Sequence, residues 1–336
     1  DFAAGIIERR SDEVANEDRW YLLKRWLDRL PSSVVESRPG LVLAYAYVQM
    51  IRNDLDAMGR MMELARRVTG PGHRLIDTAL AAYRSQTAYF TGDAATCRDQ
   101  ASRAIEHVGE QHVQFRATQE CMYALALQMQ GDATAAVRAA ESWLQSASPD
   151  QAIRATRLYL GLGLALYLSG TLETLFDELP DYREQALASR QANAMAWCAY
   201  IEGLARIQRC EFDAAVEALD QAVEYRYMHF PRAAVDVLAA LAYALEVSGR
   251  SDDADAVVDQ LYDLELGLGE THHAVVRSCE ARLALRRGDF ATARRRVRGL
   301  PASSEDIPFC WWDVPLLTAA HVRSLDADPE VADAAI

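Results

Sequence analysis

The sequence predicts an all-α fold, an α-solenoid of about eight helical hairpins that together form a right-handed superhelix. Three observations carry this prediction. Short polar breaks recur every 39 or 40 residues, small side chains stand at fixed distances from these breaks, and glycine (17) and proline (10) are scarce in a chain of 336 residues. Alanine and leucine, which fill the chain, favour helices, and stacked hairpins share a core that one hairpin cannot form alone.

The breaks set the length of the repeat. Most of them consist of a glycine followed by a polar residue, as in Gly92-Asp93 and Gly131-Asp132. Extrapolation by 39 residues adds one turn at each end. We therefore expect a single helical-repeat domain over residues 1–336, truncated at both ends, instead of the two domains that the length alone suggests. Its turns are predicted near residues 14–16, 53, 92, 131, 170, 210, 249, 288 and 327.

Small residues flank the breaks on both sides. Seven positions before the break, every unit has a small side chain, at Ala46, Ser85, Ala124, Gly163, Gly203, Ala242 and Ala281. Five positions after the break, five of the seven units again have a small side chain, at Cys97, Ala136, Ala215, Ala254 and Ala293. Small side chains beside a tight turn let two antiparallel helices approach closely. Each unit is therefore predicted to be a helical hairpin.

Prolines and glycines predict where the helices begin and end. First helices are expected to begin at Pro39, Pro231 and Pro315, since proline fits the first turn of a helix. Second helices are expected to be closed by Pro31, Pro180 and Pro301, because proline disrupts a helix interior. The glycine at most breaks suits the left-handed residue that ends a helix. Between the breaks, apolar residues of 212–223 recur at intervals of three and four, as one helical face requires.

The composition excludes several classes of function. A net charge of −14 argues against a nucleic-acid surface or an anionic-membrane anchor, so we expect no DNA binding and no membrane association. The six cysteines are widely separated and form no C-x-x-C pair, which favours reduced thiols in a cytoplasmic protein. No run of about 18 apolar residues, the length of a membrane-spanning helix, occurs.

Enzyme and metal motifs are missing from the sequence. The only lysine, Lys24, has no glycine-rich loop beside it, and no G-x-S-x-G occurs. His107 and His112 are five residues apart and do not form H-E-x-x-H. The arginine run at 294–298 could grip an acidic partner, although solvated helix surface explains it better. We therefore expect no catalytic residue and no metal site.

The hairpins resemble tetratricopeptide repeats (TPRs), although 39 residues exceed the usual length of about 34. More specifically, Trp26-Leu27, Leu30-Pro31, Pro39 and Tyr45-Ala46-Tyr47 resemble the start of the repeat domain in MalT-like regulators, and residues 311–318 resemble a late repeat of that group. The resemblance implies the sensor region of a LuxR-type transcription activator. The NTPase and helix-turn-helix domains of such an activator are not in this chain. ATP is expected only in that absent NTPase, so no cofactor is expected here.

The resemblance to TPRs also implies a concave surface lined by the first helix of each hairpin, with inward positions ten, six and three residues before each turn. Aromatic faces with nearby amides and charges suit a small polar effector or a peptide. Each aromatic could instead only seal one hairpin against the next. The candidate ligand-binding residues are Tyr47, Gln86, Tyr89, Gln128, Tyr167, Trp197, Tyr200, Tyr243, Glu246 and Arg282.

These features predict a non-enzymatic sensor that binds an effector or peptide in the groove. It would relay binding to other domains of the same regulator or through self-association. Two alternatives remain open at this point. One is a protein-interaction scaffold without a small-molecule ligand, and the other is the repeat region of a multidomain signalling kinase or cyclase. The sequence does not identify the effector.

Overall fold

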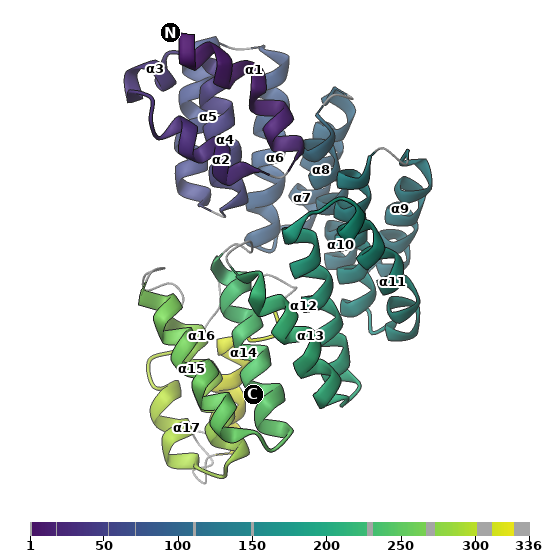
Figure 1. Ribbon diagram of the computed structural model, residues 1–336, viewed down its shortest axis with the longest axis vertical. Coiled ribbons are helices and arrows are strands. Elements are labelled where there is room, and N and C mark those ends of the chain that lie inside the picture. Colours follow the sequence, from purple (N-terminus) through teal and green to yellow (C-terminus); the bar gives the residue numbers. More distant parts are fainter. Residues whose placement is uncertain are drawn as a thin grey trace. The chain divides into compact units, whose positions relative to one another are not determined.

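Helices separated by short turns make up the chain in a computed structural model (Figure 1). The structure describes residues 2–17, 19–52, 54–70, 72–109, 112–148, 151–226, 231–266, 273–300 and 311–325. Within these ranges every regular element is a helix, which confirms the all-α prediction. The expected turn residues 53 and 327, together with Pro301 and Cys310, lie outside the described residues. The chain divides into two units, Asp1–Ala194 and Met195–Ile336, which we describe separately.

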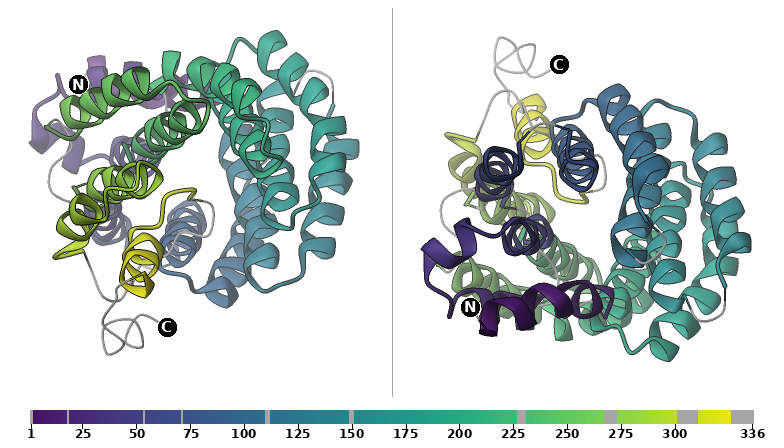
Figure 2. Two further views of the ribbon diagram at one scale, coloured as in Figure 1. Left: turned by 90° about the horizontal axis from the view of Figure 1, so that it is seen from below. Right: turned by 90° about the horizontal axis from the view of Figure 1, so that it is seen from above.

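The first unit contains α1 to α11, which pack mainly against their neighbours in sequence. Figure 2 shows α8 to α11 side by side as antiparallel hairpins. The helices are α1 (Phe2–Asn16), α2 (Trp20–Leu27), α3 (Ser32–Glu36), α4 (Pro39–Ile51), α5 (Leu55–Thr69), α6 (Arg74–Phe90), α7 (Ala94–His107), α8 (Val113–Met129), α9 (Ala133–Ser146), α10 (Ala152–Leu168) and α11 (Leu172–Ala188).

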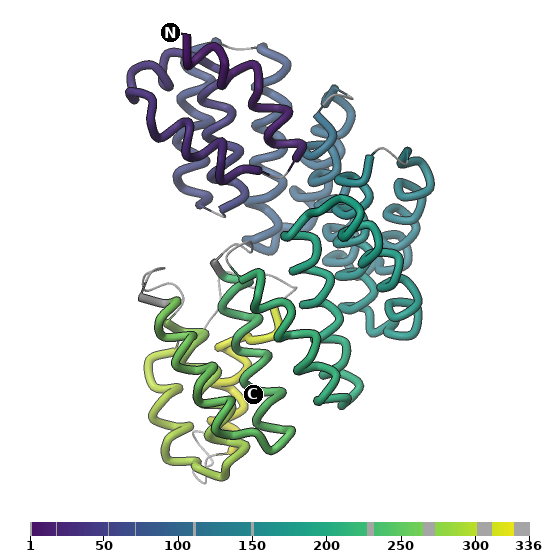
Figure 3. Tube along the Cα trace, in the orientation of Figure 1, coloured from purple at the N-terminus to yellow at the C-terminus, as the bar shows by residue number. Residues whose placement is uncertain are grey.

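The second unit contains most of α12 and all of α13 to α18. The trace in Figure 3 runs along one helix and back along the next, and α14 packs against both α15 and α16. The helices are α12 (Ala192–Gln208), α13 (Phe212–Glu224), α14 (Pro231–Val247), α15 (Ser251–Leu266), α16 (His273–Arg286), α17 (Phe290–Val297) and α18 (Pro315–Ser324).

Each glycine break combines a helix end with a helix start. Gly92 has a φ of 78°, the left-handed conformation predicted for it, and Gly131, Gly170, Gly249 and Gly288 share it. At four breaks an aspartate then caps the next helix. Asp93 accepts a hydrogen bond from the Thr96 N–H at 3.0 Å, and Asp54, Asp132 and Asp289 cap their helices in the same way. A two-residue glycine–aspartate break is therefore sufficient to reverse the chain.

The small residues beside the breaks are closely packed. A Cβ atom added to Gly203 on α12 would lie 2.5 Å from Cγ of Leu219 on α13. After the breaks, Ala136, Ala215 and Ala293 are fully buried. The hairpins therefore close as tightly as the pattern of small residues predicts, since larger side chains would separate the helices.

Two predictions from proline have different outcomes. Helices α4, α14 and α18 begin at Pro39, Pro231 and Pro315, as expected. The expectation that Pro180 closes a helix is wrong, because α11 continues through it to Ala188. Leu179 and Tyr182, on either side of Pro180, are both buried. Continued burial of this face offsets the one backbone hydrogen bond that proline removes.

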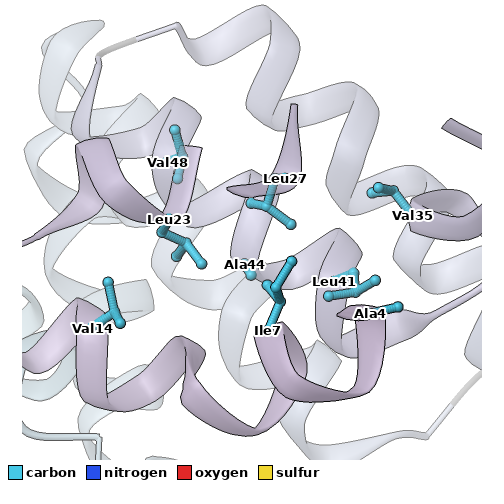
Figure 4. Close-up of a cluster of buried hydrophobic side chains, with 9 residues drawn as sticks. All are labelled: Ala4, Ile7, Val14, Leu23, Leu27, Val35, Leu41, Ala44 and Val48. Atoms are coloured by element: carbon cyan, nitrogen blue, oxygen red, sulfur yellow. The ribbon is translucent and has the colours of Figure 1, made fainter. Parts of the chain in front are cut away.

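Apolar residues from α1 to α4 close the beginning of the first unit. Figure 4 shows Ala4, Ile7 and Val14 of α1 facing Leu23 and Leu27 of α2, with Val35, Leu41, Ala44 and Val48 completing the cluster. Trp20, Trp26 and Tyr45 pack against its edge. Helix α1 ends at Asn16, beside the turn expected near residues 14–16. Its apolar face is thus buried against α2 and α4.

Candidate functional site

The first helices of the hairpins in the second unit hold a short non-helical segment of the same chain, Trp311–Val314. Asp236 of α14 is at the centre of this contact and is 0% exposed. Its carboxylate accepts hydrogen bonds from two consecutive backbone N–H groups, those of Trp312 at 2.8 Å and Asp313 at 2.9 Å. The hydroxyl of Tyr200, on α12, donates to the same carboxylate. Two helices therefore converge on the backbone of the segment.

Arg232 completes the contact with the backbone from one turn earlier on α14. Its Nη1 donates to Oδ1 of Asp236 at 2.9 Å, and its Nη2 donates to the carbonyl oxygen of Asp313 at 2.6 Å. The pair thus contacts both donor and acceptor groups of the segment's main chain. Charged groups make stronger hydrogen bonds than neutral ones. This part of the site recognises a polypeptide backbone without regard to its side chains.

Stacked arginines hold the two tryptophan side chains of the segment. The guanidinium of Arg282, on α16, lies 3.7 Å from the ring centroid of Trp312 and 5.1 Å from that of Tyr243. The Tyr243 and Trp312 centroids are 5.1 Å apart. Arg232 lies 4.8 Å from the ring centroid of Trp311. Cation–π contacts of this kind contribute most where the cation is desolvated, so the side chains add specificity for aromatic residues.

The Asp313 side chain carries an unusual charge environment. It is fully buried, and its Oδ2 lies 3.7 Å from Nη1 of Arg282. Burial is the main effect and raises the pKa of Asp313 to about 6. The positive charge of Arg282 opposes this rise, and the carboxylate of Asp236 adds to it. The segment therefore carries a buried carboxyl group, that of Asp313, whose ionised form is destabilised by burial.

The predicted groove residues of the second unit lie at or near this contact. Tyr200 is 0% exposed, and Trp197 packs edge-to-face against it with centroids 5.7 Å apart. Tyr243 and Arg282 hold Trp312 between them. Glu246 instead binds Arg287, with Oε2 2.7 Å from Nη2. Three of the five predicted residues thus contact the segment or the aspartate that binds it.

The first unit contains a separate cavity of about 770 Å³. Its apolar lining includes Met50, Met58 and Met62 from α4 and α5, together with Leu75 and Phe115. Thioether side chains adapt to varied ligand shapes because they are flexible and polarizable. The polar part of the lining is made up of Glu8, Ser11, Asp12, Asn16, His73, Arg74, Thr78, His107, His112 and Gln114.

Two contacts fix α1 beside this cavity. Nδ1 of His112 lies 3.3 Å from Oδ1 of Asp12, and the hydrogen bond with that carboxylate raises the pKa of His112. Asn16 Oδ1 accepts a hydrogen bond from the backbone N–H of Gln114 at 3.1 Å. The end of α1 is thereby tied to the start of α8.

A basic hollow of about 550 Å³ adjoins the apolar cavity. Its lining contains Arg66, Arg74, Arg84 and Arg103 from α5, α6 and α7, but only one carboxylate, Asp77. The two spaces share Gly72, Arg74, Thr78 and His107. In a chain with a net charge of −14, this local excess of cations favours an anionic group.

The predicted groove residues of the first unit are distributed between the cavity and the helix contacts. Tyr47 lines the cavity, and Gln86 donates to the carbonyl oxygen of Met50 at 3.1 Å. Tyr89 and Tyr167 are buried, and Tyr89 packs edge-to-face against Phe90. Gln128 lies in α8, and its Oε1 is buried. Of the predicted residues in the first unit, only Tyr47 thus lines the cavity. Gln86 is connected to it indirectly, through its hydrogen bond to the lining residue Met50.

Several functional candidates were missed by the sequence reasoning. Asp236 is the only charged residue in the otherwise apolar stretch 233–245, and Arg232 precedes it by one helical turn. A lone acid in a buried helix is a signal that could have indicated it. By contrast, Arg66, Arg84 and Arg103 lie on three different helices, so their convergence depends on how these helices pack.

The described part of the chain contains neither a candidate metal site nor a membrane-spanning helix. No cluster of three or more histidine, cysteine, aspartate or glutamate side chains there could hold a metal ion. None of the helices that the structure describes has the length and apolar character needed to cross a membrane. The described cysteines, which include Cys97, Cys121 and Cys279, form no disulfide with one another.

Comparison with known proteins relates this fold to solved structures of Rap proteins. A Rap protein complexed with competence and sporulation factor matches with a TM-score of 0.66 and 12% identity, covering 99% of this chain and 94% of that chain. The Rap conjugation gene regulator of the plasmid pLS20, in complex with the Phr* peptide, matches with a TM-score of 0.58 and 12% identity over the same shares. The apo form of RapI matches with a TM-score of 0.51 and 10% identity over 88% of each chain.

These structural matches establish a fold of TPR-like helical repeats. No protein-family model and no curated protein matches the sequence. At 10–12% identity the structural likeness concerns the fold alone. Function must therefore be argued from the sites themselves.

Proposed function

We propose that this chain is a non-catalytic peptide-binding module whose ligand combines apolar side chains with an anionic group. The observation that carries the proposal is that two spaces in the first unit adjoin and share lining residues. The apolar cavity and the basic hollow share Arg74, Thr78 and His107, so one ligand can fill the first and place a carboxylate in the second. Apolar burial supplies affinity, and the arginines orient the ligand.

A short peptide suits this pair of spaces better than a sugar does. The cavity of about 770 Å³ has room for several side chains, and alongside its polar groups it has an apolar part, rich in methionine, that suits apolar side chains better than sugar hydroxyls. A peptide also brings its own anion, as a terminal carboxylate or an acidic side chain. Two of the structural matches, the Rap protein with competence and sporulation factor and the pLS20 regulator with Phr*, are complexes, which supports a peptide ligand for this fold.

The wider role that we propose is the cytoplasmic sensor region of a MalT-like, LuxR-type regulator. Support comes from the resemblance of residues 26–47 and 311–318 to that group. Peptide binding would favour one arrangement of the repeats and so alter contacts with other domains or with a second copy. A reading frame that encodes an NTPase on one side and a helix-turn-helix on the other would support this role. A kinase or cyclase domain there would contradict it.

Binding can be tested with a library of synthetic pentapeptides, followed by calorimetry with the tightest binder. Leu75 lines the cavity and is 44% exposed, so Leu75→Ser removes apolar contact at little cost to folding. We expect about tenfold weaker binding, equivalent to about 1.4 kcal/mol. The matched control is Leu187→Ser on α11, where leucine is 60% exposed outside the cavity.

Recognition of the ligand's anionic group can be tested by comparing two arginines of one helix. Arg103 lines the basic hollow, whereas Arg98, on the same helix α7, does not. Arg103→Ala should weaken binding several-fold at low salt and less at high salt, because exposed charges are screened. Arg98→Ala should leave affinity unchanged. If no pentapeptide binds, or if the best binder is indifferent to both Leu75→Ser and Arg103→Ala, the proposed function is wrong.

A further inference from the structure

The second unit contains an aromatic and charged site that is already filled by the chain itself. Asp236 and Arg232 bind the backbone of residues 312 and 313, and Arg282 stacks on Trp312. Arg232 and Asp236 belong to α14, and Arg282 belongs to α16. The segment that they hold begins 75 positions after Asp236 in the sequence. The contact therefore has the form of a peptide bound to a folded surface.

We propose that this surface is a second peptide-binding site, for which Trp311–Asp313 acts as an internal ligand. The competing partner is a peptide that adopts the bend of residues 311–314, and in which an aromatic residue is followed by an acidic one. Such a peptide would displace the segment from α14 and α16. This inference does not depend on the cavity of the first unit, because every residue that it uses belongs to the second.

The backbone contacts explain why the occupant must be a peptide. Asp236 accepts from two adjacent main-chain N–H groups, at 2.8 and 2.9 Å, and Arg232 donates to the carbonyl of the second residue at 2.6 Å. Adjacent N–H groups of an extended strand point in opposite directions, so this pairing depends on the bend of the segment at Trp312. A polypeptide that adopts the same bend presents two donors and an acceptor in that order. An isolated buried carboxylate is costly, so the site favours replacement of the segment over simple loss of it.

The aromatic contacts explain why the site would prefer peptides in which an aromatic residue is followed by an acidic one. Arg282 lies 3.7 Å from the Trp312 centroid, and Tyr243 packs against the same indole from 5.1 Å. Arg282 also approaches the Asp313 carboxylate at 3.7 Å. One arginine thus contacts both an aromatic ring and the acid that follows it in sequence, which selects for that order of side chains.

The anchoring of α18 allows the segment to leave while the unit remains folded. Ala319 and Val322 of α18 are buried in a cluster with Ala281 and Val297. The Ser278 hydroxyl also donates to Thr318 Oγ1 at 2.8 Å. These contacts begin beyond the segment and do not involve Asp236. Local opening can therefore involve residues 311–313 while Val314 remains the N-cap of α18.

The probe for this site is a labelled peptide with the chain's own sequence, Trp-Trp-Asp-Val-Pro-Leu. In the wild-type chain the tethered segment competes at millimolar effective concentration, so binding should be weak. Trp312→Ala removes the stacked indole and leaves Asp236, Arg232 and Arg282 in place. We expect this variant to bind the peptide at least tenfold more tightly than the wild type in fluorescence anisotropy.

Two controls make the result specific. Trp143→Ala removes a tryptophan that packs against Tyr123 in the first unit, and it should not enhance binding. Adding Arg282→Ala to Trp312→Ala should abolish the gain. The proposal is wrong if a folded Trp312→Ala chain, judged by its thermal transition, binds no better than the wild type, or if Arg282→Ala has no effect.

A second measurement uses the wild-type chain and does not depend on how the variants fold. Hydrogen–deuterium exchange is followed across residues 311–314 with and without millimolar unlabelled peptide. Displacement should increase exchange at the Trp312 and Asp313 amides while α18 stays protected. Unchanged exchange at a peptide concentration that saturates the Trp312→Ala variant overturns the proposal.

Discussion

The buried carboxyl group of Asp313 should make the second unit less stable as the pH rises. Its ordinary pKa of 3.8 is raised to about 6 in the folded chain, mainly because the group is buried. Among the surrounding charges, Arg282 and Arg232 oppose the rise, whereas Asp236 adds to it. A raised pKa means that the folded state binds the proton more tightly than the unfolded state does. The resulting stability is complete below the unfolded pKa and is lost as the pH rises through about 6.

The size of the effect follows from the difference between the two pKa values. A rise from 3.8 to about 6 corresponds to roughly 3 kcal/mol, since each unit is about 1.4 kcal/mol. Asp313→Asn keeps the shape of the side chain and cannot ionise. Relative to this variant, the wild-type chain should therefore lose about 3 kcal/mol of unfolding free energy between about pH 4 and about pH 7.

Urea denaturation at several pH values measures this difference. Far-UV circular dichroism and tryptophan fluorescence should be recorded together, because a chain with two units need not unfold in one step. Asp259→Asn, on an exposed position of α15, serves as the control and should follow the wild-type pH dependence. The reasoning is refuted if Asp313→Asn and the wild type change in parallel over this range.

Three smaller predictions concern helix contacts. Arg154→Leu should destabilise the first unit by about 3 kcal/mol in urea denaturation, because fully buried Glu120 loses two hydrogen bonds, and replacing both residues by leucine should restore stability. Gly203→Ala should cost about 1–3 kcal/mol through overlap with Leu219, and this cost should be smaller in a Leu219→Ala background if overlap is the cause. The protection factor of the α1 amides, which corrects hydrogen exchange for its intrinsic pH dependence, should fall as the pH rises through the raised pKa of His112, because the neutral imidazole pairs less strongly with the carboxylate on α1. His112→Asn should remove that pH dependence.

The repeat could be predicted from the sequence because its determinants are local. A glycine with positive φ and an aspartate that caps the next helix lie in adjacent positions, so their effect does not depend on distant contacts. Pro39, Pro231 and Pro315 mark helix starts for the same reason. Pro180 misled the prediction because burial of Leu179 and Tyr182, a tertiary effect, sustains α11 through it.

The candidate sites could be predicted only in part. The positions expected to face the concave surface include Tyr47, which lines the cavity. They also include Tyr200, Tyr243 and Arg282, which lie near the docked segment. Helix periodicity could select them because each faces its site from a single helix. The basic hollow needs three helices to pack together, which helix periodicity does not specify. The docking of residue 312 on residue 236 is likewise a contact across 76 positions, with no signal in local spacing.

The buried carboxylate of Asp236 influences which ligands the second site can bind. The carboxylate accepts hydrogen bonds from Tyr200, Arg232 and two backbone N–H groups of the docked segment. When the segment leaves, half of these donors leave with it, and water or another ligand must replace them. Another main chain with the same bend replaces the two adjacent donors and also accepts from Arg232. The requirement to satisfy one buried acid therefore favours a ligand with two neighbouring donors and one acceptor, which a peptide main chain provides before any of its side chains is considered.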